Sequence, residues 1–114
     1  MTRILLLEDE TMIQMLIEDY ITDLGYEVIP TSSLEEAIAA SEEHDFDLAV
    51  LDINLGNGTN SFPLAEMLIE RQKPFVFMSG YSSQSIEGFE EVRKLSKPIN
   101  FKTLQTTLAE LTSA

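Results

Sequence analysis

The sequence predicts an α/β fold in which a doubly wound, five-stranded parallel sheet carries helices on both faces. Short apolar runs end at polar residues, and stretches with helical periodicity separate these runs. The two kinds of segment alternate through all 114 residues without a linker or an internal repeat. Apolar runs suit strands that are buried on both faces, and helices are the usual crossovers between parallel strands. We therefore expect one domain, residues 1–114.

Five segments have the composition of strands. The clearest are three continuous apolar runs, which are Ile4 to Leu7, Leu48 to Leu51 and Phe75 to Met78. Val28-Ile29 is a shorter candidate, and Val92 to Ser96 is the weakest. All five are bounded by turn-forming or charged residues, as buried strands usually are.

Apolar side chains recur at i, i+3 and i+4 in four of the stretches between strands, which predicts amphipathic helices. These stretches are Thr11 to Leu24, Leu34 to Ile38, Phe62 to Ile69 and Phe101 to Leu111. Ser32-Ser33 and Asn100 can cap two of them, and Gly25 can end the first. The methionines at 12, 15, 67 and 78 are expected in the core.

The stretch 82–91 is the weakest helix candidate. Only Ile86 and Phe89 are apolar there, and Gly88 interrupts the pattern. We therefore expect this helix, the fourth along the chain, to be short or poorly ordered.

The composition excludes several kinds of site. The formal charge is −13, from 7 Lys and Arg against 20 Asp and Glu. This leaves no basic surface for nucleic acid or for an anionic membrane. There is no cysteine, and His44 is the single histidine, so thiolate zinc sites and Ser-His triads lack their residues. No apolar run approaches the roughly 18 residues of a membrane span, and we expect a cytoplasmic protein.

Polar residues that can do chemistry follow four of the predicted strands. They are Glu8-Asp9, Asp52, Ser79-Gly80 and Lys97-Pro98. Each alone has an ordinary structural role as a helix cap or a turn. In a doubly wound sheet, however, ligands bind at the carboxyl ends of the strands, and all four would lie at that edge.

Three carboxylates, a hydroxyl and an ammonium at one edge indicate phosphoryl transfer. Clustered carboxylates bind Mg²⁺ through oxygen, and an aspartate can attack phosphorus to form an aspartyl phosphate. A lysine and a metal can neutralise the transferred group, and a serine hydroxyl can donate to one of its oxygens.

In their order and spacing, these residues resemble the signature of the two-component response-regulator receiver domain, which is CheY-like. The resemblance covers essentially the whole chain. It implies a flavodoxin-like sheet with strand order 2-1-3-4-5. It also implies that Asp52 is the phosphoacceptor and that a histidine kinase supplies the phosphoryl group.

The same resemblance implies roles for the other residues of the site. Mg²⁺ would be bound by Asp9, by Asp52 and by the backbone carbonyl of Asn54, and Glu8 would act through metal-bound water. Ser79 and Lys97 would contact the phosphoryl group. The Lys97-Pro98 peptide would be cis.

Two features depart from the usual receiver pattern. Lys94 stands where most receivers carry an aromatic residue on the fifth strand, and the stretch from Ser79 to Lys97 is about four residues shorter than is common. The run from Pro74 to Tyr81 is similar to the FAT GUY subfamily, with Ser79 in place of Thr. Those receivers also lack the aromatic and are paired with kinases of the HWE type. Tyr81 is either a loop aromatic that covers the sheet edge or a gate over the site.

The sequence thus predicts a stand-alone phosphoacceptor that is not an enzyme in its own right. It would signal through protein contacts, by onward phosphotransfer, as a phosphate sink or by docking. The resemblance implies that the face of the fourth helix, fifth strand and fifth helix is the contact surface, and the expected contact residues there are Lys94, Phe89 and Phe101. We expect a monomer.

Two alternatives remain open. The first is a pseudo-receiver that binds partners without phosphorylation, which the missing aromatic favours and the intact Asp9, Asp52 and Lys97 oppose. The second is a phosphohydrolase of the haloacid dehalogenase type. That enzyme would need an acid where this chain has Asn54.

Overall fold

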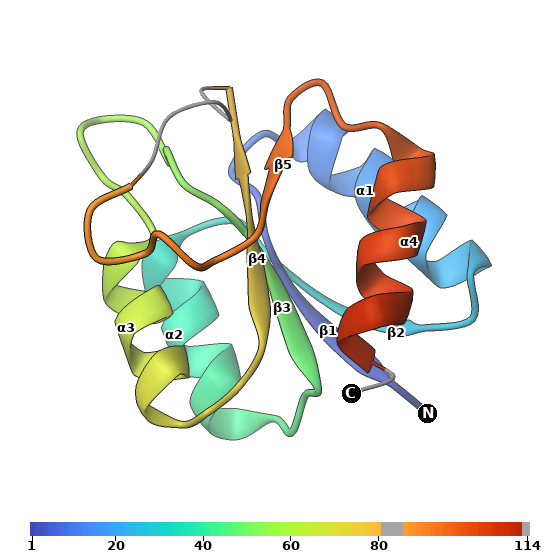
Figure 1. The fold of residues 1–114 in the computed structure, drawn as a ribbon, viewed down its shortest axis with the longest axis horizontal. Coiled ribbons are helices and arrows are strands. Elements are labelled where there is room, and N and C mark those ends of the chain that lie inside the picture. The colour runs from blue at the N-terminus through green and yellow to red at the C-terminus, as the bar shows by residue number, and fades with distance from the viewer. Residues whose placement is uncertain (81–85, 113–114) are drawn as a thin grey trace.

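The computed structural model describes residues 1–80 and 86–112. It contains one five-stranded parallel sheet with the order β2-β1-β3-β4-β5 (Figure 1), which confirms the predicted topology. The strands are β1 (Arg3–Leu7), β2 (Glu27–Thr31), β3 (Leu48–Asp52), β4 (Phe75–Ser79) and β5 (Lys94–Ser96). The order reverses between β1 and β3, and their carboxyl ends lie at the switch point where doubly wound sheets bind ligands.

In residues 1–80 and 86–112, four helices cover the two faces of the sheet. They are α1 (Thr11–Asp23), α2 (Leu34–Glu43), α3 (Phe62–Glu70) and α4 (Phe101–Thr112). Helices α1 and α4 lie on one face, and α2 and α3 lie on the other (Figure 1). Alternate residues of each strand serve the two layers, so that Ile4 and Leu6 pack under α1 while Leu5 and Leu7 pack under α2. This use of both faces explains why the inner strands β1, β3 and β4 are almost entirely apolar.

Local sequence signals set several helix boundaries. The hydroxyl of Ser33 accepts a hydrogen bond from the Glu36 amide at 3.1 Å, and the side chain of Asn100 accepts one from the Thr103 amide at 3.1 Å. Both caps satisfy an amide that has no partner within its helix. Gly25 follows α1 with a φ of +99°, a conformation that suits glycine.

The connection between β4 and β5 contains no helix in its described part, residues 86–93. It forms turns, in which the Phe89 amide donates to Ile86 and the Val92 amide donates to Phe89. The Phe89 ring stacks on Phe62 with centroids 5.0 Å apart and meets Phe77 edge-on. Phe89 is only 6% exposed. This corrects the expectation that its ring is offered to a partner, because the ring is packed in the core against Phe62 and Phe77.

Helix α1 carries apolar residues outward as well as inward. Met12 is 83% exposed, Met15 is 56% exposed and Leu16 is 60% exposed, whereas Ile17 and Ile21 are buried against the sheet. The prediction that Met12 and Met15 belong to the core is therefore wrong, while Met78 is fully buried as predicted. An exposed apolar group of this kind often marks a contact surface.

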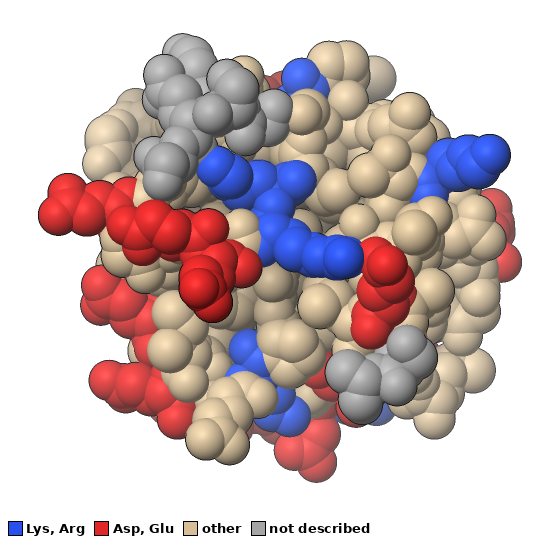
Figure 2. Space-filling view, in the orientation of Figure 1, with Lys and Arg blue, Asp and Glu red and all other residues tan. Residues whose placement is uncertain are grey.

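The few cations are unevenly distributed. Of the 7 Lys and Arg residues, those at 93, 94, 97 and 102 lie within one short stretch. Figure 2 shows Lys and Arg atoms gathered in the middle of one face, with Asp and Glu mainly to their left. Arg93 forms an ion pair with Glu110 at 2.7 Å.

Within the described ranges, no helix has the length and apolar character needed to cross a membrane.

Candidate functional site at the carboxyl edge of the sheet

The carboxyl ends of β1, β3, β4 and β5 converge on one pocket. Its volume is about 480 Å³. The lining residues are Asp9, Glu10, Asp52, Ile53, Asn54, Gly56, Ser79, Gly80 and Lys97. The structure thus brings together residues that are far apart in the sequence, because parallel strands all end at the same edge.

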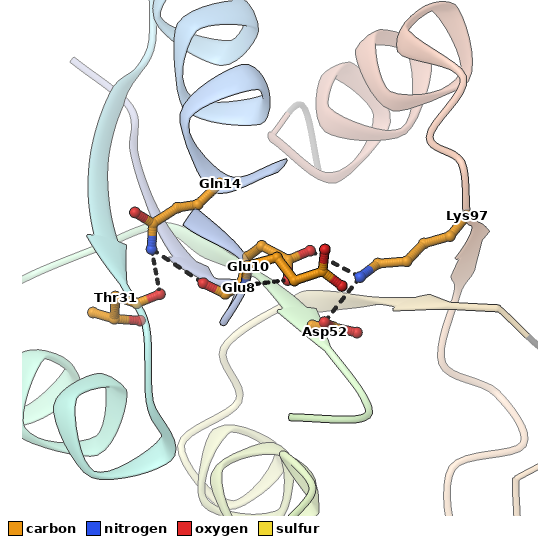
Figure 3. Close-up of polar contacts among 6 residues, drawn as sticks. All are labelled: Glu8, Glu10, Gln14, Thr31, Asp52 and Lys97. Carbon is orange, nitrogen blue, oxygen red and sulfur yellow. Dashed lines mark hydrogen bonds and ion pairs between the residues drawn. The ribbon is translucent and has the colours of Figure 1, made fainter. Parts of the chain in front are cut away.

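Lys97 lies between two buried carboxylates (Figure 3). Its Nζ is 2.8 Å from Oε1 of Glu8 and 2.9 Å from Oδ2 of Asp52. Glu8 is 0% exposed and Asp52 is 4% exposed. A buried carboxylate needs a charged or hydrogen-bonding partner, and one ammonium serves both.

The turn that carries Glu8 and Asp9 is held by several hydrogen bonds. The second oxygen of Glu8, Oε2, accepts from the Glu10 amide at 3.1 Å, and the Glu8 amide donates to the Thr31 carbonyl at 3.1 Å. The side-chain amide of Gln14 lies against the carbonyls of Glu8 and Thr31 (Figure 3). The carboxylate of Glu8 is therefore fixed toward Lys97 and away from solvent.

Among the carboxylates of Glu8, Asp9 and Asp52, that of Asp9 is the one accessible to solvent. Gly56, with a φ of +80°, lies beside it, and a Cβ at that position would come within 3.7 Å of Oδ2 of Asp9. Glu8, Asp9 and Asp52 each offer an oxygen, and these oxygens lie within 4.8 Å of one another. This oxygen donor set fits a hard divalent cation such as Mg²⁺, which takes one or two carboxylates and completes its shell with water.

The pKa of Asp52 is raised from 3.8 to about 7. Burial is the main cause and the nearby Glu8 adds to it, whereas the hydrogen bond and charge of Lys97 act in the opposite direction. The pKa of Lys97 is raised as well: burial would lower it, but the hydrogen bonds to Glu8 and Asp52 and the charges of these carboxylates together outweigh burial. Lys97 is therefore a permanent cation of the site, and Asp52 is the group that titrates near neutrality.

Ser79 and Lys97 are joined through the backbone. Ser79 ends β4, is 8% exposed and lines the pocket, and its carbonyl accepts from the Lys97 amide at 3.0 Å. The peptide between Lys97 and Pro98 is cis. Asn54 also lines the pocket, and its side chain accepts from the Gly56 amide at 3.0 Å, which shapes the turn after β3.

The remaining predicted residues lie away from the pocket or outside the described residues. Lys94 is on β5 opposite Phe77, at the edge of the sheet. Phe101 starts α4 and stacks on Tyr20 with centroids 4.6 Å apart. Tyr81 lies outside the described residues.

Sequence reasoning missed Gln14 and Thr31. Gln14 is the one amide in the apolar stretch from Met12 to Ile17. A lone polar residue in such a stretch is a usable signal, because it needs a hydrogen-bond partner where it is partly buried. The identity of that partner depends on how α1 sits on the strand ends.

Comparison with known proteins gives a consistent set of matches. A family model described as the response regulator receiver domain matches residues 4–109. The transcriptional regulatory protein PdtaR of Mycobacterium tuberculosis is 26% identical over 85 residues, which cover 74% of this chain and 42% of that protein. The chain thus spans less than half the length of this curated relative.

Solved structures agree with the fold. SdrG from Sphingomonas melonis Fr1 has a TM-score of 0.81 at 34% identity and covers 98% of this chain and 97% of its own. The response regulator TrrA from Thermotoga maritima, in complex with Mg²⁺-BeF, has a TM-score of 0.86 at 24% identity, with coverage of 97% and 99%. At that identity, the second match supports the fold alone.

Proposed function

Because the chain belongs to the response regulator receiver domain family, we propose that it accepts a phosphoryl group on Asp52 from a histidine kinase. The observation that carries this proposal is the position of Asp52 in the pocket. Its carboxylate is buried against Lys97, within reach of Asp9, and opens into a cavity of about 480 Å³. This reaction needs a nucleophile, a cation beside the phosphoryl group and a carboxylate that can bind a metal ion. Asp52, Lys97 and Asp9 can supply them in that order.

In the proposed step, an oxygen of the Asp52 carboxylate attacks the phosphorus of a phosphohistidine. The P–O bond forms as the P–N bond breaks, and the imidazole nitrogen leaves with the bonding electrons. The ionised carboxylate is the nucleophile, so Lys97 favours the reactive form by opposing the raised pKa of Asp52. The same ammonium remains beside the phosphoryl group once it is attached, and the Ser79 hydroxyl supplies a second donor.

We assign the metal site to Asp9, Asp52 and the backbone carbonyl of Asn54, with Glu8 acting through water. Glu8 suits an indirect role because both of its oxygens already accept hydrogen bonds, from Lys97 and from the Glu10 amide. Bound Mg²⁺ would neutralise charge on the phosphoryl oxygens. Asp9 is the accessible carboxylate among Glu8, Asp9 and Asp52, so we expect it to be the first of the three to meet an incoming metal ion.

The protein that donates the phosphoryl group must contact the rim of the pocket. The exposed face of α1, formed by Met12, Met15 and Leu16, adjoins an apolar groove lined in part by Lys97 and Pro98. We place the kinase on this face, in the cytoplasm, where ATP is available. The change Leu16→Asn, which removes the apolar contact without changing the charge, should slow transfer from a histidine kinase that phosphorylates the wild type and leave transfer from acetyl phosphate unchanged.

We propose that the phosphorylated chain signals by contact with a further protein, through the face that includes Lys94 and Phe101. The contact would serve onward phosphotransfer, a role as a phosphate sink, or docking. The FAT GUY features of residues 74–81 support a kinase of the HWE type, and we expect a monomer that is not an enzyme beyond its own phosphorylation. A pseudo-receiver is the second candidate. Lys94, opposite Phe77 where the usual aromatic is absent, favours it.

An amide NMR titration with Mg²⁺ and then beryllofluoride tests the proposal. Wild type, Asp52→Ala and the control Asp19→Ala, which removes an exposed acid of α1, would be compared. We expect metal-dependent shifts around residues 9, 52, 79 and 97, followed by beryllofluoride shifts that Asp52→Ala abolishes and Asp19→Ala retains. A silent wild type would support the pseudo-receiver instead.

A further inference from the structure

Gln14 joins three elements at the edge of the site (Figure 3). Its Nε2 lies 2.7 Å from the Thr31 carbonyl, 3.2 Å from the Glu8 carbonyl and 3.2 Å from the hydroxyl of Ser32. Gln14 itself is in the first turns of α1, where its backbone amide donates to Glu10 at 2.9 Å. One half-buried side chain thus connects α1, the residue after β1 and the end of β2.

The contact with Glu8 lies beyond the regular strand pairing. Leu7 and Thr31 are the last partners of the β1–β2 ladder, so Glu8 is the first residue whose carbonyl lies past it. That carbonyl belongs to the planar peptide that links Glu8 to Asp9. Fixing the carbonyl therefore fixes the plane that contains the Asp9 amide and the Asp9 Cα.

The two sides of the turn are then held by different groups. Lys97 and the Glu10 amide hold the carboxylate of Glu8, as described above, and Gln14 holds its carbonyl. Asp9, next in the chain, is accessible to solvent, and Gly56 lies beside its carboxylate. The backbone that carries Asp9 is thus held on its amino-terminal side by Gln14.

We propose that Gln14 is a positioning residue that prepares Asp9 for a divalent cation by holding the Glu8–Asp9 peptide. This inference rests on the proposed function in one respect, that a divalent cation binds at Asp9. A ligand held in its binding orientation loses less conformational entropy on binding, and groups behind metal ligands typically change affinity by 10- to 100-fold. Gln14 holds the backbone next to the metal ligand Asp9 and does not contact the Asp9 side chain, so we expect an effect at the lower end of that range.

The test is a Mg²⁺ titration of the full chain, followed by amide NMR, in wild type, Gln14→Met and Gln105→Met. Methionine keeps the length of glutamine and removes the donor. Gln105 is an exposed glutamine of α4, where the same change serves as a matched control. We expect the Kd for Mg²⁺ to rise about 10-fold in Gln14→Met, the lower end of that range, and to stay at the wild-type value in Gln105→Met.

A purely structural role gives a different result. It would lower the melting temperature of Gln14→Met with no change in Kd, and that outcome overturns the inference while the proposed function stands. A wild type that binds no Mg²⁺ overturns both. If Gln14→Met does not fold, hydrogen exchange in the wild type decides, because coupling is reciprocal. Mg²⁺ should then slow exchange of the Gln14 side-chain amide but not that of Gln105, and equal exchange at Gln14 with and without Mg²⁺ overturns the inference.

Discussion

Lys97 and Asp52 are 45 residues apart in the chain, yet Nζ of Lys97 lies 2.9 Å from Oδ2 of Asp52. The same ammonium serves Glu8, so one cation faces two buried carboxylates. The charge of Lys97 is therefore insufficient to offset the burial of Asp52, whose pKa is raised to about 7.

The raised pKa makes stability depend on pH. Between about pH 4 and pH 7, the folded chain holds a proton on Asp52 that the unfolded chain has lost, so the free energy of unfolding falls as pH rises through this window. Asp52→Asn removes the cost of the buried charge. We expect it to stabilise the chain at pH 8 by ~1–2 kcal/mol relative to wild type, after loss of the Lys97 pair, and to have little effect at pH 4.

Urea unfolding at the two pH values, without divalent cations, measures this difference. Asp19→Asn is the matched control, since it removes an exposed carboxylate of α1. An Asp52→Asn variant that is no more stable than wild type at pH 8 contradicts the prediction.

Lys97 should control the titration of Asp52 directly. Because Lys97 lowers the pKa of Asp52 against the effect of burial, Lys97→Met should move the midpoint above 7. The carboxyl carbon of Asp52, followed by ¹³C NMR over pH 4–10, reports the midpoint. The change Lys102→Met removes a cation from the exposed side of α4 and should leave the midpoint in place. A midpoint that does not move in Lys97→Met contradicts the assignment.

Asp9 and Glu10 are neighbouring acids at the pocket, but they should differ in metal binding. Asp9 shares the oxygen cluster with Glu8 and Asp52, and Glu10 is exposed and outside that cluster. We expect Asp9→Asn to weaken Mg²⁺ binding at least 10-fold, whereas Glu10→Gln changes it less than 2-fold. Isothermal titration calorimetry measures both, and equal losses would show a response to overall charge.

Phe89 should contribute to stability as a core residue. Its ring packs on Phe62 and Phe77, so Phe89→Ala should lower the free energy of unfolding by about 3 kcal/mol. Phe101→Ala removes a half-buried ring that stacks on Tyr20 and should cost less. Urea denaturation of both variants tests the order, and a cost below about 1 kcal/mol for Phe89→Ala would mean that its ring lies outside the core in solution.

The strands and the pocket were predictable because they depend on local patterns. The apolar runs at residues 4–7, 48–51 and 75–78 identify strands buried on both faces, and parallel strands bring the residues that follow them to one edge. The acidic turn, Asp52, Ser79 and Lys97 therefore appear together in the structure as expected.

Features that depend on packing were not predictable. The apolar residues of α1 form a stripe too wide for one interface. Only the way in which α1 packs on the sheet decides that Ile17 is buried while Leu16 is exposed. Phe89 is buried because the turns of residues 86–92 bring its ring against Phe62 and Phe77. Gln14 reaches Glu8 because α1 begins beside two strand ends. Neither contact follows from the spacing of residues in the chain.

A net charge of −13 repels every anion that approaches Asp52. Small phosphodonors such as acetyl phosphate are anions, so salt that screens this repulsion should speed their encounter with the pocket. The same charge attracts divalent cations, and salt should weaken that attraction over the Debye length of about 10 Å at 0.1 M. In the proposed phosphorylation of Asp52, reaction with small donors should therefore be fastest at an intermediate ionic strength. That optimal ionic strength should rise as the concentration of Mg²⁺ increases.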